Sequence, residues 1–339
     1  MTGRELKLSL AGAAIAVAVL MTLSRVSGVS LSDVYELPAQ TVALSVALSL
    51  LRMASQGLRF YLIVGSASRT RVGFCEALAM RGASEFFALT TVPFVADEAA
   101  RAVMLARKGE RPVTALWIAT AELVVDVAVT APLMVISGIY ATLVGSWAIA
   151  VVVLVVSTLQ IVGVSILAAY AGGTGDGGVR AGRLTALLPP QVRRAMGEGV
   201  REMRRVLRVL VDSESFSRTA AVIIASLAVT VMPSLVLLVL LGDLSAGGVV
   251  RALYSTMAGN ALGVLPVSVG GAGVTEAGVY LYLTGVYGVG DWELVLRWRL
   301  LTYYVTLSLT AAVLAFYLLT LRRPNQARLL RTSPPGPDP

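Results

Sequence analysis

Eight ionisable residues lie within long apolar runs of the sequence, and they are the first candidates for chemistry. A charge in an apolar environment is costly unless it is paired or hydrated, so each group indicates a binding, proton-transfer or ion-pairing role. The eight residues are Arg52, Arg81, Glu85, Glu122, Asp126, Glu276, Arg297 and Arg299.

The spacing of these residues suggests two kinds of site. Glu122 and Asp126 lie four residues apart, so a helix places both carboxylates on one face. Arg52 and Arg81 can each bind a phosphate or a carboxylate through two N–H groups. Arg81 also has Glu85 one helical turn away, and an intrahelical ion pair is the alternative interpretation.

A segment rich in helix breakers, LPVSVGGAGVTEAG, interrupts another apolar run at residues 265–278. Its proline and glycines let the backbone leave one helix and start another near Val274, where free N–H groups would form an anion site. Glu276 lies in the first turn of that new helix. It either caps the helix or meets an amine or a proton during a transport cycle, and the sequence leaves both open.

The composition excludes several classes of chemistry. The chain has 339 residues, no histidine and one cysteine, Cys75. Internal disulfides, nucleophile–histidine catalysis and histidine-based zinc sites are therefore excluded. We expect no enzyme activity, no cofactor and no metal. The net charge of +8 resides mainly between the apolar runs, as in membrane proteins, so we also expect no nucleic-acid partner.

The elements that must position these residues are long apolar helices. Hydrophobic residues make up 56% of the chain and charged residues 14%, which is typical of a polytopic membrane protein. About 20 apolar residues cross the hydrocarbon of a bilayer. We predict an all-α polytopic integral membrane protein with six full spans. The alternative interpretation of the first span is a cleaved signal peptide. The spans are residues 6–24, 38–64, 113–141, 147–170, 218–241 and 293–321.

Lysine and arginine residues gather on alternate loops, and this bias orients the spans. Basic residues near the N-terminus, at 69–71, at 101–111, at 180–218 and in the tail share one side. We assign that side to the cytoplasm and the protein to the cell (plasma) membrane. Both termini are then cytoplasmic, and residues 322–339 are expected to form a disordered tail.

Two apolar regions, 72–107 and 249–288, each begin and end on the same side of the membrane. Each is broken near a proline, Pro93 or Pro266, and these prolines lie 173 residues apart. The same offset superimposes span 38–64 on 218–241 and span 113–141 on 293–321. We predict two opposed re-entrant helical hairpins in inverted-topology repeats. A chance match of hydropathy is the alternative.

This organisation divides the chain into five parts. An N-terminal span with its outer loop (1–37) precedes a first repeat with an extra span (38–170), and a cytoplasmic linker (171–217) joins it to the second repeat (218–321) and the tail. Within the linker, apolar and arginine residues alternate at helical spacing over residues 191–210. This basic amphipathic helix either recruits anionic lipid head groups or only fixes the topology.

The repeat offset also predicts contacts. It places Asp126 opposite Arg299, so we predict an ion pair that either holds the repeats in register or takes part in transport. Arg101, after the first break, is expected near the cytoplasmic mouth of a cleft. Arg59 lies near the cytoplasmic end of its span, where its side chain can reach the interface, and we assign it no special role.

Three segments carry a resemblance to a known family. They are VPFVADEAARAVMLARKG, ELVVD and LPVSVGGAGVTEAG, and together they resemble the flippase-like membrane domain of lysylphosphatidylglycerol synthases. The similarity extends from the second span to the last. The chain has FVAD where the family tends to place glycines, and it ends at Pro339 without the synthase domain. The resemblance implies translocation of a lipid between leaflets.

We therefore predict a lipid flippase that works by alternating access. Its partners would be membrane lipids, namely anionic or aminoacylated phospholipids or polyprenyl-linked lipids, and homo-oligomerisation stays open. The rival interpretation is a non-catalytic membrane anchor or assembly subunit for a cell-envelope or glycosyl-transfer enzyme. The predicted substrate-binding residues are Arg52, Arg81, Glu85, Asp97, Arg101, Glu122, Asp126, Asn260, Pro266, Gly270, Gly271, Gly273, Glu276 and Arg299.

Overall fold

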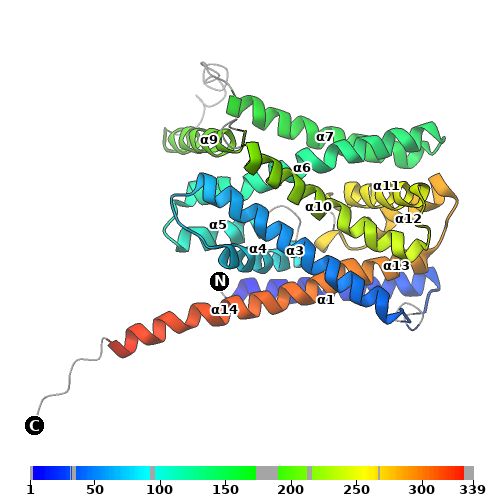
Figure 1. The fold of residues 1–339 in the computed structure, drawn as a ribbon, viewed down its shortest axis with the longest axis horizontal. Coiled ribbons are helices and arrows are strands. Elements are labelled where there is room, and N and C mark those ends of the chain that lie inside the picture. Colours follow the sequence, from blue (N-terminus) through cyan, green and yellow to red (C-terminus); the bar gives the residue numbers. More distant parts are fainter. Residues whose placement is uncertain are drawn as a thin grey trace, which may run out of the picture.

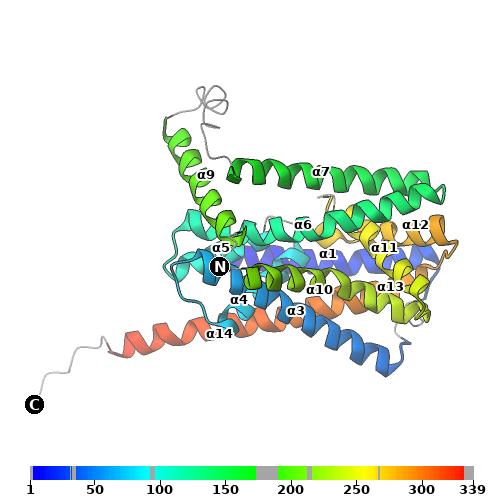
Figure 2. The ribbon, with the colours of Figure 1, turned by 45° about the horizontal axis from the view of Figure 1, so that its top comes forward.

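The computed structural model describes residues 3–30, 32, 36–91, 96–172, 190–211, 216–265 and 268–331, and every regular element in these ranges is helical. Most of the helices run almost side by side in an elongated bundle (Figure 1), whereas α9 is steeply inclined to them (Figure 2). In chain order they are α1 (Gly3–Ser27), α3 (Ala39–Ala67), α4 (Phe74–Thr90), α5 (Ala96–Arg107), α6 (Pro112–Leu143), α7 (Trp147–Gly172), α9 (Pro190–Val211), α10 (Phe216–Leu241), α11 (Ala246–Gly263), η2 (Val269–Gly271), α12 (Val274–Tyr287), α13 (Trp292–Arg299), η3 (Leu300–Tyr304) and α14 (Val305–Arg331).

Five stretches of the described chain are long and apolar enough to cross a membrane. They are Ala39–Ala67, Pro112–Leu143, Trp147–Ile166, Phe216–Leu241 and Trp292–Thr320. They coincide with five of the six predicted spans, which supports a membrane-embedded helical protein. The remaining predicted span falls in α1, where the apolar stretch Ala13–Ser27 is shorter than the other five.

Two helix pairs are broken rather than continuous. In the first, α4 ends at Thr90, Thr91 is extended and α5 begins at Ala96; in the second, α11 ends at Gly263, η2 follows and α12 begins at Val274. In both views α4 and α5 lie toward the end of the bundle that carries α9, whereas α11 and α12 lie toward the other end (Figures 1 and 2). The prolines predicted to break these regions, Pro93 and Pro266, lie outside the described residues.

The two breaks meet inside the bundle. The Gly270 N–H donates to the Thr91 carbonyl oxygen at 3.0 Å, and the Tyr303 hydroxyl donates to the Leu89 carbonyl oxygen at 2.5 Å. Gly270 has φ = +56°, and a Cβ there would lie 2.3 Å from the Leu89 oxygen. Glycine is required at this position because both the backbone conformation and the close approach exclude a side chain.

Glycines also bring α11 and α12 into close contact. A Cβ on Gly278 would lie 2.9 Å from the Gly259 Cα, and a Cβ on Gly259 would lie 2.5 Å from a Val279 methyl group. Small residues let helix backbones approach in this way in membrane proteins. The second broken pair is therefore packed tightly along its length, which fixes the position of its break.

The two halves follow the same order of elements, with one difference in length. α3 precedes α4 as α10 precedes α11, and the 173-residue offset matches Thr90, where α4 ends, to Gly263, where α11 ends. The second break is longer than the first, so the offset no longer matches equivalent positions after it. Asp126 and Arg299 are consequently not equivalent residues, and the prediction that paired them rested on the wrong register.

The helix α9 covers the segment predicted to form a basic amphipathic helix. Its apolar face packs on α6 and α7, with Met203 and Val206 buried. The Glu202 carboxylate accepts a hydrogen bond from the Thr114 hydroxyl of α6 at 2.7 Å. The rest of the predicted linker, 173–189 and 212–215, lies outside the described residues. At the C-terminus α14 continues through Arg331, so the tail predicted to be disordered is helical at 322–331.

Candidate functional site

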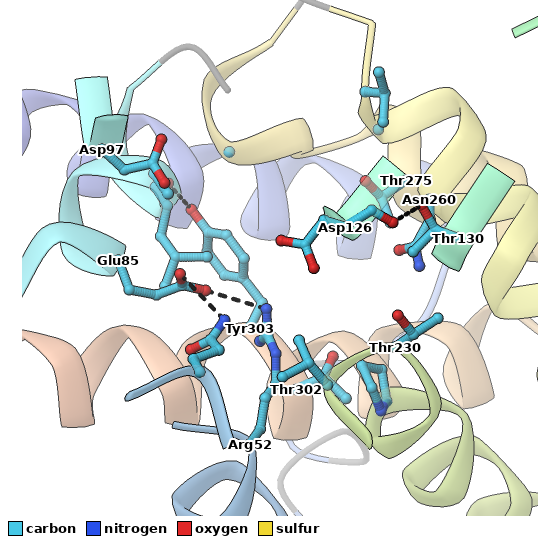
Figure 3. Close-up of a pocket in the computed structure, with 18 of the residues that line it drawn as sticks. Arg52, Glu85, Asp97, Asp126, Thr130, Thr230, Asn260, Thr275, Thr302 and Tyr303 are labelled. Atoms are coloured by element: carbon cyan, nitrogen blue, oxygen red, sulfur yellow. Dashed lines mark hydrogen bonds and ion pairs between the residues drawn. The ribbon is translucent and has the colours of Figure 1, made fainter. Parts of the chain in front are cut away.

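A cavity of about 310 Å³ lies where the two breaks meet. Its wall combines residues from both broken pairs with residues of α3, α6, α7, α10 and the start of the last span (Figure 3). Eight charged side chains line it, namely Arg52, Arg81, Glu85, Asp97, Glu98, Arg101, Asp126 and Arg299. The polar residues of the wall include Gln56, Thr130, Gln160, Thr230, Asn260, Thr275, Thr302 and Tyr303.

Most of the charge belongs to one continuous set of ion pairs on α3, α4, α5 and α6, which we call the charge network. Glu122 is at its centre and is fully buried. Its carboxylate accepts from Arg59 at 2.6 Å, from Arg81 at 3.0 Å and from Arg101. The members of the network are Arg52, Arg59, Arg81, Glu85, Asp97, Glu98, Arg101, Glu122 and Asp126.

Arg59 and Glu98 are the members that were not among the predicted site residues, and Arg59 makes the more extensive contacts. Its guanidinium is fully buried and donates to both oxygens of Asp126, with Nη2 2.8 Å from Oδ2. It also donates to the Ser226 hydroxyl of α10 at 2.9 Å. The prediction that Arg59 reaches the membrane interface is therefore wrong, as is the predicted Asp126–Arg299 ion pair. Arg52, Gln56 and Arg59 recur at the spacing of one helix face, a signal that could have identified Arg59.

Arg81 and Glu85 form the intrahelical ion pair that was the alternative to phosphate binding, at 2.5 Å. Glu85 also accepts from Arg52 at 3.1 Å and from Gln56 at 3.4 Å. Arg81 is committed to two carboxylates, because it also contacts Glu122. The Arg52 side chain is 24% exposed, and its Nε has no hydrogen-bond partner. Arg52 is therefore the most exposed arginine of the charge network, and the one most accessible to a ligand.

The first two turns of α5 bring three charges to the cavity wall. Arg101 contacts Asp97 at 3.1 Å and Glu98 at 3.3 Å, both through Nη2. Arg101 is 2% exposed, so it lies within the protein and not at the mouth of a cleft, as the sequence suggested. Two buried atoms of this group, Glu98 Oε2 and Arg101 Nε, have no hydrogen-bond partner.

A separate ion pair lies at the second break. Glu276 Oε2 accepts from the Gly273 N–H at 2.8 Å, and Glu276 Oε1 lies 2.9 Å from Arg299 Nε. Arg299 also donates to the Gly270 carbonyl oxygen at 2.9 Å and stacks over the Tyr303 ring at 4.1 Å. Glu276 thus caps α12, as one of the two interpretations held. Its carboxylate accepts the hydrogen bond of the Gly273 N–H, at the helix start where the sequence predicted an anion site.

The remaining predicted residues divide between the wall and its support. Gly270 and Asn260 line the cavity. Gly271 and Gly273 have φ of +71° and +84° and shape the turn behind it. Neutral polar residues of the wall, such as Thr130 and Gln160, carried no sequence signal, because threonine and glutamine are unremarkable in helices.

The cavity can hold a polar or ionic group away from lipid. It offers carboxylates, guanidinium groups that are not fully hydrogen-bonded, such as those of Arg52 and Arg101, hydroxyl groups and side-chain amides inside an apolar bundle. Within the described residues, no three His, Cys, Asp or Glu side chains are arranged to hold a metal ion. No model of a known protein family matches the chain, and no curated protein matches it.

Proposed function

We propose that this protein moves a polar-headed lipid, one that contains a phosphate, between the two leaflets of a membrane by alternating access. The observation that carries the proposal is the charged cavity at the meeting point of two broken helix pairs. A lipid head cannot enter hydrocarbon without losing its hydration. A cavity lined by charges and hydroxyl groups supplies replacement contacts, and the acyl chains can stay in the bilayer.

The same geometry supports a proposed membrane arrangement. The pairs α4–α5 and α11–α12 act as re-entrant hairpins from opposite sides, and their tips meet between Thr91 and Gly270. α1 serves as a sixth span, and α9 with both termini lies on the cytoplasmic side of the cell membrane. Broken helices that meet near the midplane are a common way to place a transport site.

Two groups in the wall suggest what the cavity binds. Arg52 retains an unbonded Nε and partial exposure, which suits a phosphate oxygen. The Asp126 side chain is 31% exposed, lies in the same wall and suits a hydroxyl or cationic group. The resemblance to the flippase-like domain of lysylphosphatidylglycerol synthases supports a lipid substrate, either an anionic or aminoacylated phospholipid or a polyprenyl-linked lipid.

Reconstitution into liposomes tests the proposal. Labelled anionic, zwitterionic and aminoacylated lipids are incorporated, and an impermeant quencher reports exchange between leaflets. We expect exchange of at least one class, and Arg52→Ala should slow it about tenfold or more, because a charge-assisted hydrogen bond contributes about 1.5–3 kcal/mol. Arg297→Ala is the matched control, because Arg297 pairs with Glu293 outside the cavity wall.

Absence of exchange for every lipid class would remove the proposal. It would favour a membrane anchor or assembly subunit instead. The observation that supports an anchor or assembly subunit is the face of α9 that does not pack on the bundle, where Arg201 and Arg208 are exposed. In that case, replacing both arginines with glutamine should weaken the assembly of an envelope enzyme, with lipid exchange absent throughout.

A further inference from the structure

The charge network contains more carboxylates than guanidinium groups. Glu85, Asp97, Glu98, Glu122 and Asp126 face four arginines, namely Arg52, Arg59, Arg81 and Arg101. Across the cavity, Arg299 is matched by its own partner, Glu276. Arginine does not lose its proton in proteins. If every carboxylate were ionised, the described residues around the cavity would carry one uncompensated negative charge.

The N-terminus of α5 cannot compensate the whole excess. A helix N-terminus is equivalent to about half a positive charge, and Asp97 and Glu98 both lie in the first turn of α5. An unbalanced ion in an apolar interior is strongly disfavoured, and a buried acid normally takes up a proton instead. A proton on one carboxyl group, or a cation in the cavity, would compensate this excess.

Glu98 is the carboxyl group of the network with the fewest and longest ion-pair and hydrogen-bond contacts. Its one ion pair, to Arg101, is the longest in the network at 3.3 Å, and Arg101 shares the same nitrogen with Asp97. The other oxygen, Oε2, is buried without a hydrogen-bond partner, although Glu98 lines the cavity and is only 7% exposed. Every other carboxylate of the network accepts at least one hydrogen bond from a side chain.

We propose that Glu98 binds one exchangeable proton, and that this proton leaves when a cationic group of a lipid head enters the cavity. The proton comes from a hydronium ion in water that reaches the cavity, so that one O–H bond of hydronium breaks as the Oε–H bond of Glu98 forms. On release the Oε–H bond breaks and water accepts the proton as hydronium. The other charged groups of the network around Glu98 are Asp97 and Arg101 on its own helix α5, Arg81 and Glu85 on α4, Glu122 and Asp126 on α6, and Arg52 and Arg59 on α3. The exchange makes the protein a proton–lipid antiporter. This coupling rests on the proposed function, whereas the proton site does not.

The proton site is tested without transport, by infrared difference spectroscopy of the purified protein in H₂O and D₂O. At neutral pH we expect a band from one buried, protonated carboxyl group, which Glu98→Gln removes and which Glu293→Gln, a partly exposed control, leaves in place. A band that survives in Glu98→Gln would overturn the assignment. So would a band that Asp97→Asn removes and Glu98→Gln does not.

The coupling is tested in proteoliposomes with a pH gradient. A lipid that carries an amine should accumulate in the leaflet that faces the acidic side, by up to about tenfold per pH unit for one proton per lipid. Glu98→Gln should abolish this bias. Exchange that ignores the gradient in the wild type overturns the coupling and leaves the proposed function standing. Absence of any exchange overturns the proposed function, and the infrared band then decides on the proton site alone.

Discussion

The two broken helix pairs occupy comparable places in the bundle but treat charge differently. The first pair, with α3 and α6, holds nine charged residues in a network that is unbalanced and faces the cavity. The second pair holds one balanced ion pair, Glu276–Arg299, in which the acid caps α12 and the base holds the turn at Gly270. A similar scaffold thus serves two tasks. The first half supplies the binding surface, and the second fixes the break that closes it.

This difference explains why the glycines with positive φ at the breaks are found at the second break. The second break contains three glycines with positive φ, and the backbone itself forms the surface of the turn. A turn made of backbone needs one carboxylate and one guanidinium to satisfy its N–H and C=O groups. In the first half the side chains of helices form the surface, and their charges must compensate one another. The predictions below test this division of labour.

The largest expected effect is at the centre of the network. Glu122→Gln leaves Arg59, Arg81 and Arg101 without their shared carboxylate, and removal of one partner from a buried ion pair costs about 3–5 kcal/mol. The midpoint of unfolding in detergent should fall accordingly, and lipid exchange should be lost. Glu293→Gln, in a partly exposed pair with Arg297, should change stability by about 0.5 kcal/mol or less. Equal midpoints for the two variants would refute the central place of Glu122.

The contact between the two halves is tested by a pair of glycine variants. Gly270→Ala and Gly288→Ala both place alanine at positive φ, +56° and +69°, but only at position 270 does the new Cβ meet the Leu89 oxygen. The shared conformational strain is about 1–2 kcal/mol. We expect Gly270→Ala to be destabilised by about 3 kcal/mol in total and to lose lipid exchange. If both variants lose the same stability, the breaks do not depend on this close approach.

The second half should tolerate loss of charge without loss of transport. Glu276→Gln keeps an acceptor for the Gly273 N–H but removes the ion pair with Arg299, at a cost of about 2 kcal/mol. Because Glu276 does not line the cavity, lipid exchange per folded molecule should stay within about twofold of the wild type, measured in the same liposome assay. Asp126→Asn, in the wall, should instead slow exchange about tenfold. The reverse order of the two effects would contradict the proposed division.

The smallest effect is expected outside the cavity, at the loop between α5 and α6. Burial alone would raise the pKa of Glu110, but hydrogen bonds from the Ser68 hydroxyl and from the N–H groups of Arg69, Arg111 and Thr70 outweigh it and lower the pKa below its usual value. The stabilisation is therefore present above the pKa of the unfolded chain and is lost as the pH falls through the lowered pKa. Glu110→Gln should remove about 1 kcal/mol at neutral pH and flatten the acid side of a stability–pH curve. A curve with an unchanged slope would exclude this role.

The sequence predicted the helical membrane character and the two broken regions because both depend on local composition. Long apolar runs must form helices in lipid, and glycines clustered near a proline favour a break in a helix, although a lone proline does not end α6 at Pro132 or α10 at Pro233. The intrahelical pair Arg81–Glu85 and the cap at Glu276 were also accessible, because their partners lie within one turn. These features need no knowledge of which helices are neighbours.

The pairings across helices could not be predicted in the same way. Arg59 lies more than sixty residues from Glu122 and Asp126, and only the packing of α3 on α6 brings them together. The 173-residue offset between the two halves was used instead to predict contacts between helices. This offset no longer matches the helices after the second break, because that break is longer than the first. Asp126 was therefore assigned to Arg299. Glu98 was seen only as part of an acidic segment, because its unbonded oxygen depends on how Arg101 is shared.

The most direct test of the central claim is whether the cavity is the path of the lipid head. In a Cys75→Ser background, which removes the one native cysteine, Thr130→Cys places a thiol in the wall, and Ile136→Cys on the same helix places one on the 47% exposed apolar surface. We predict that a charged, membrane-impermeant thiol reagent modifies Thr130→Cys from both sides of the proteoliposome and abolishes lipid exchange, while Ile136→Cys continues to exchange lipid. Undiminished exchange by fully modified Thr130→Cys would contradict the account.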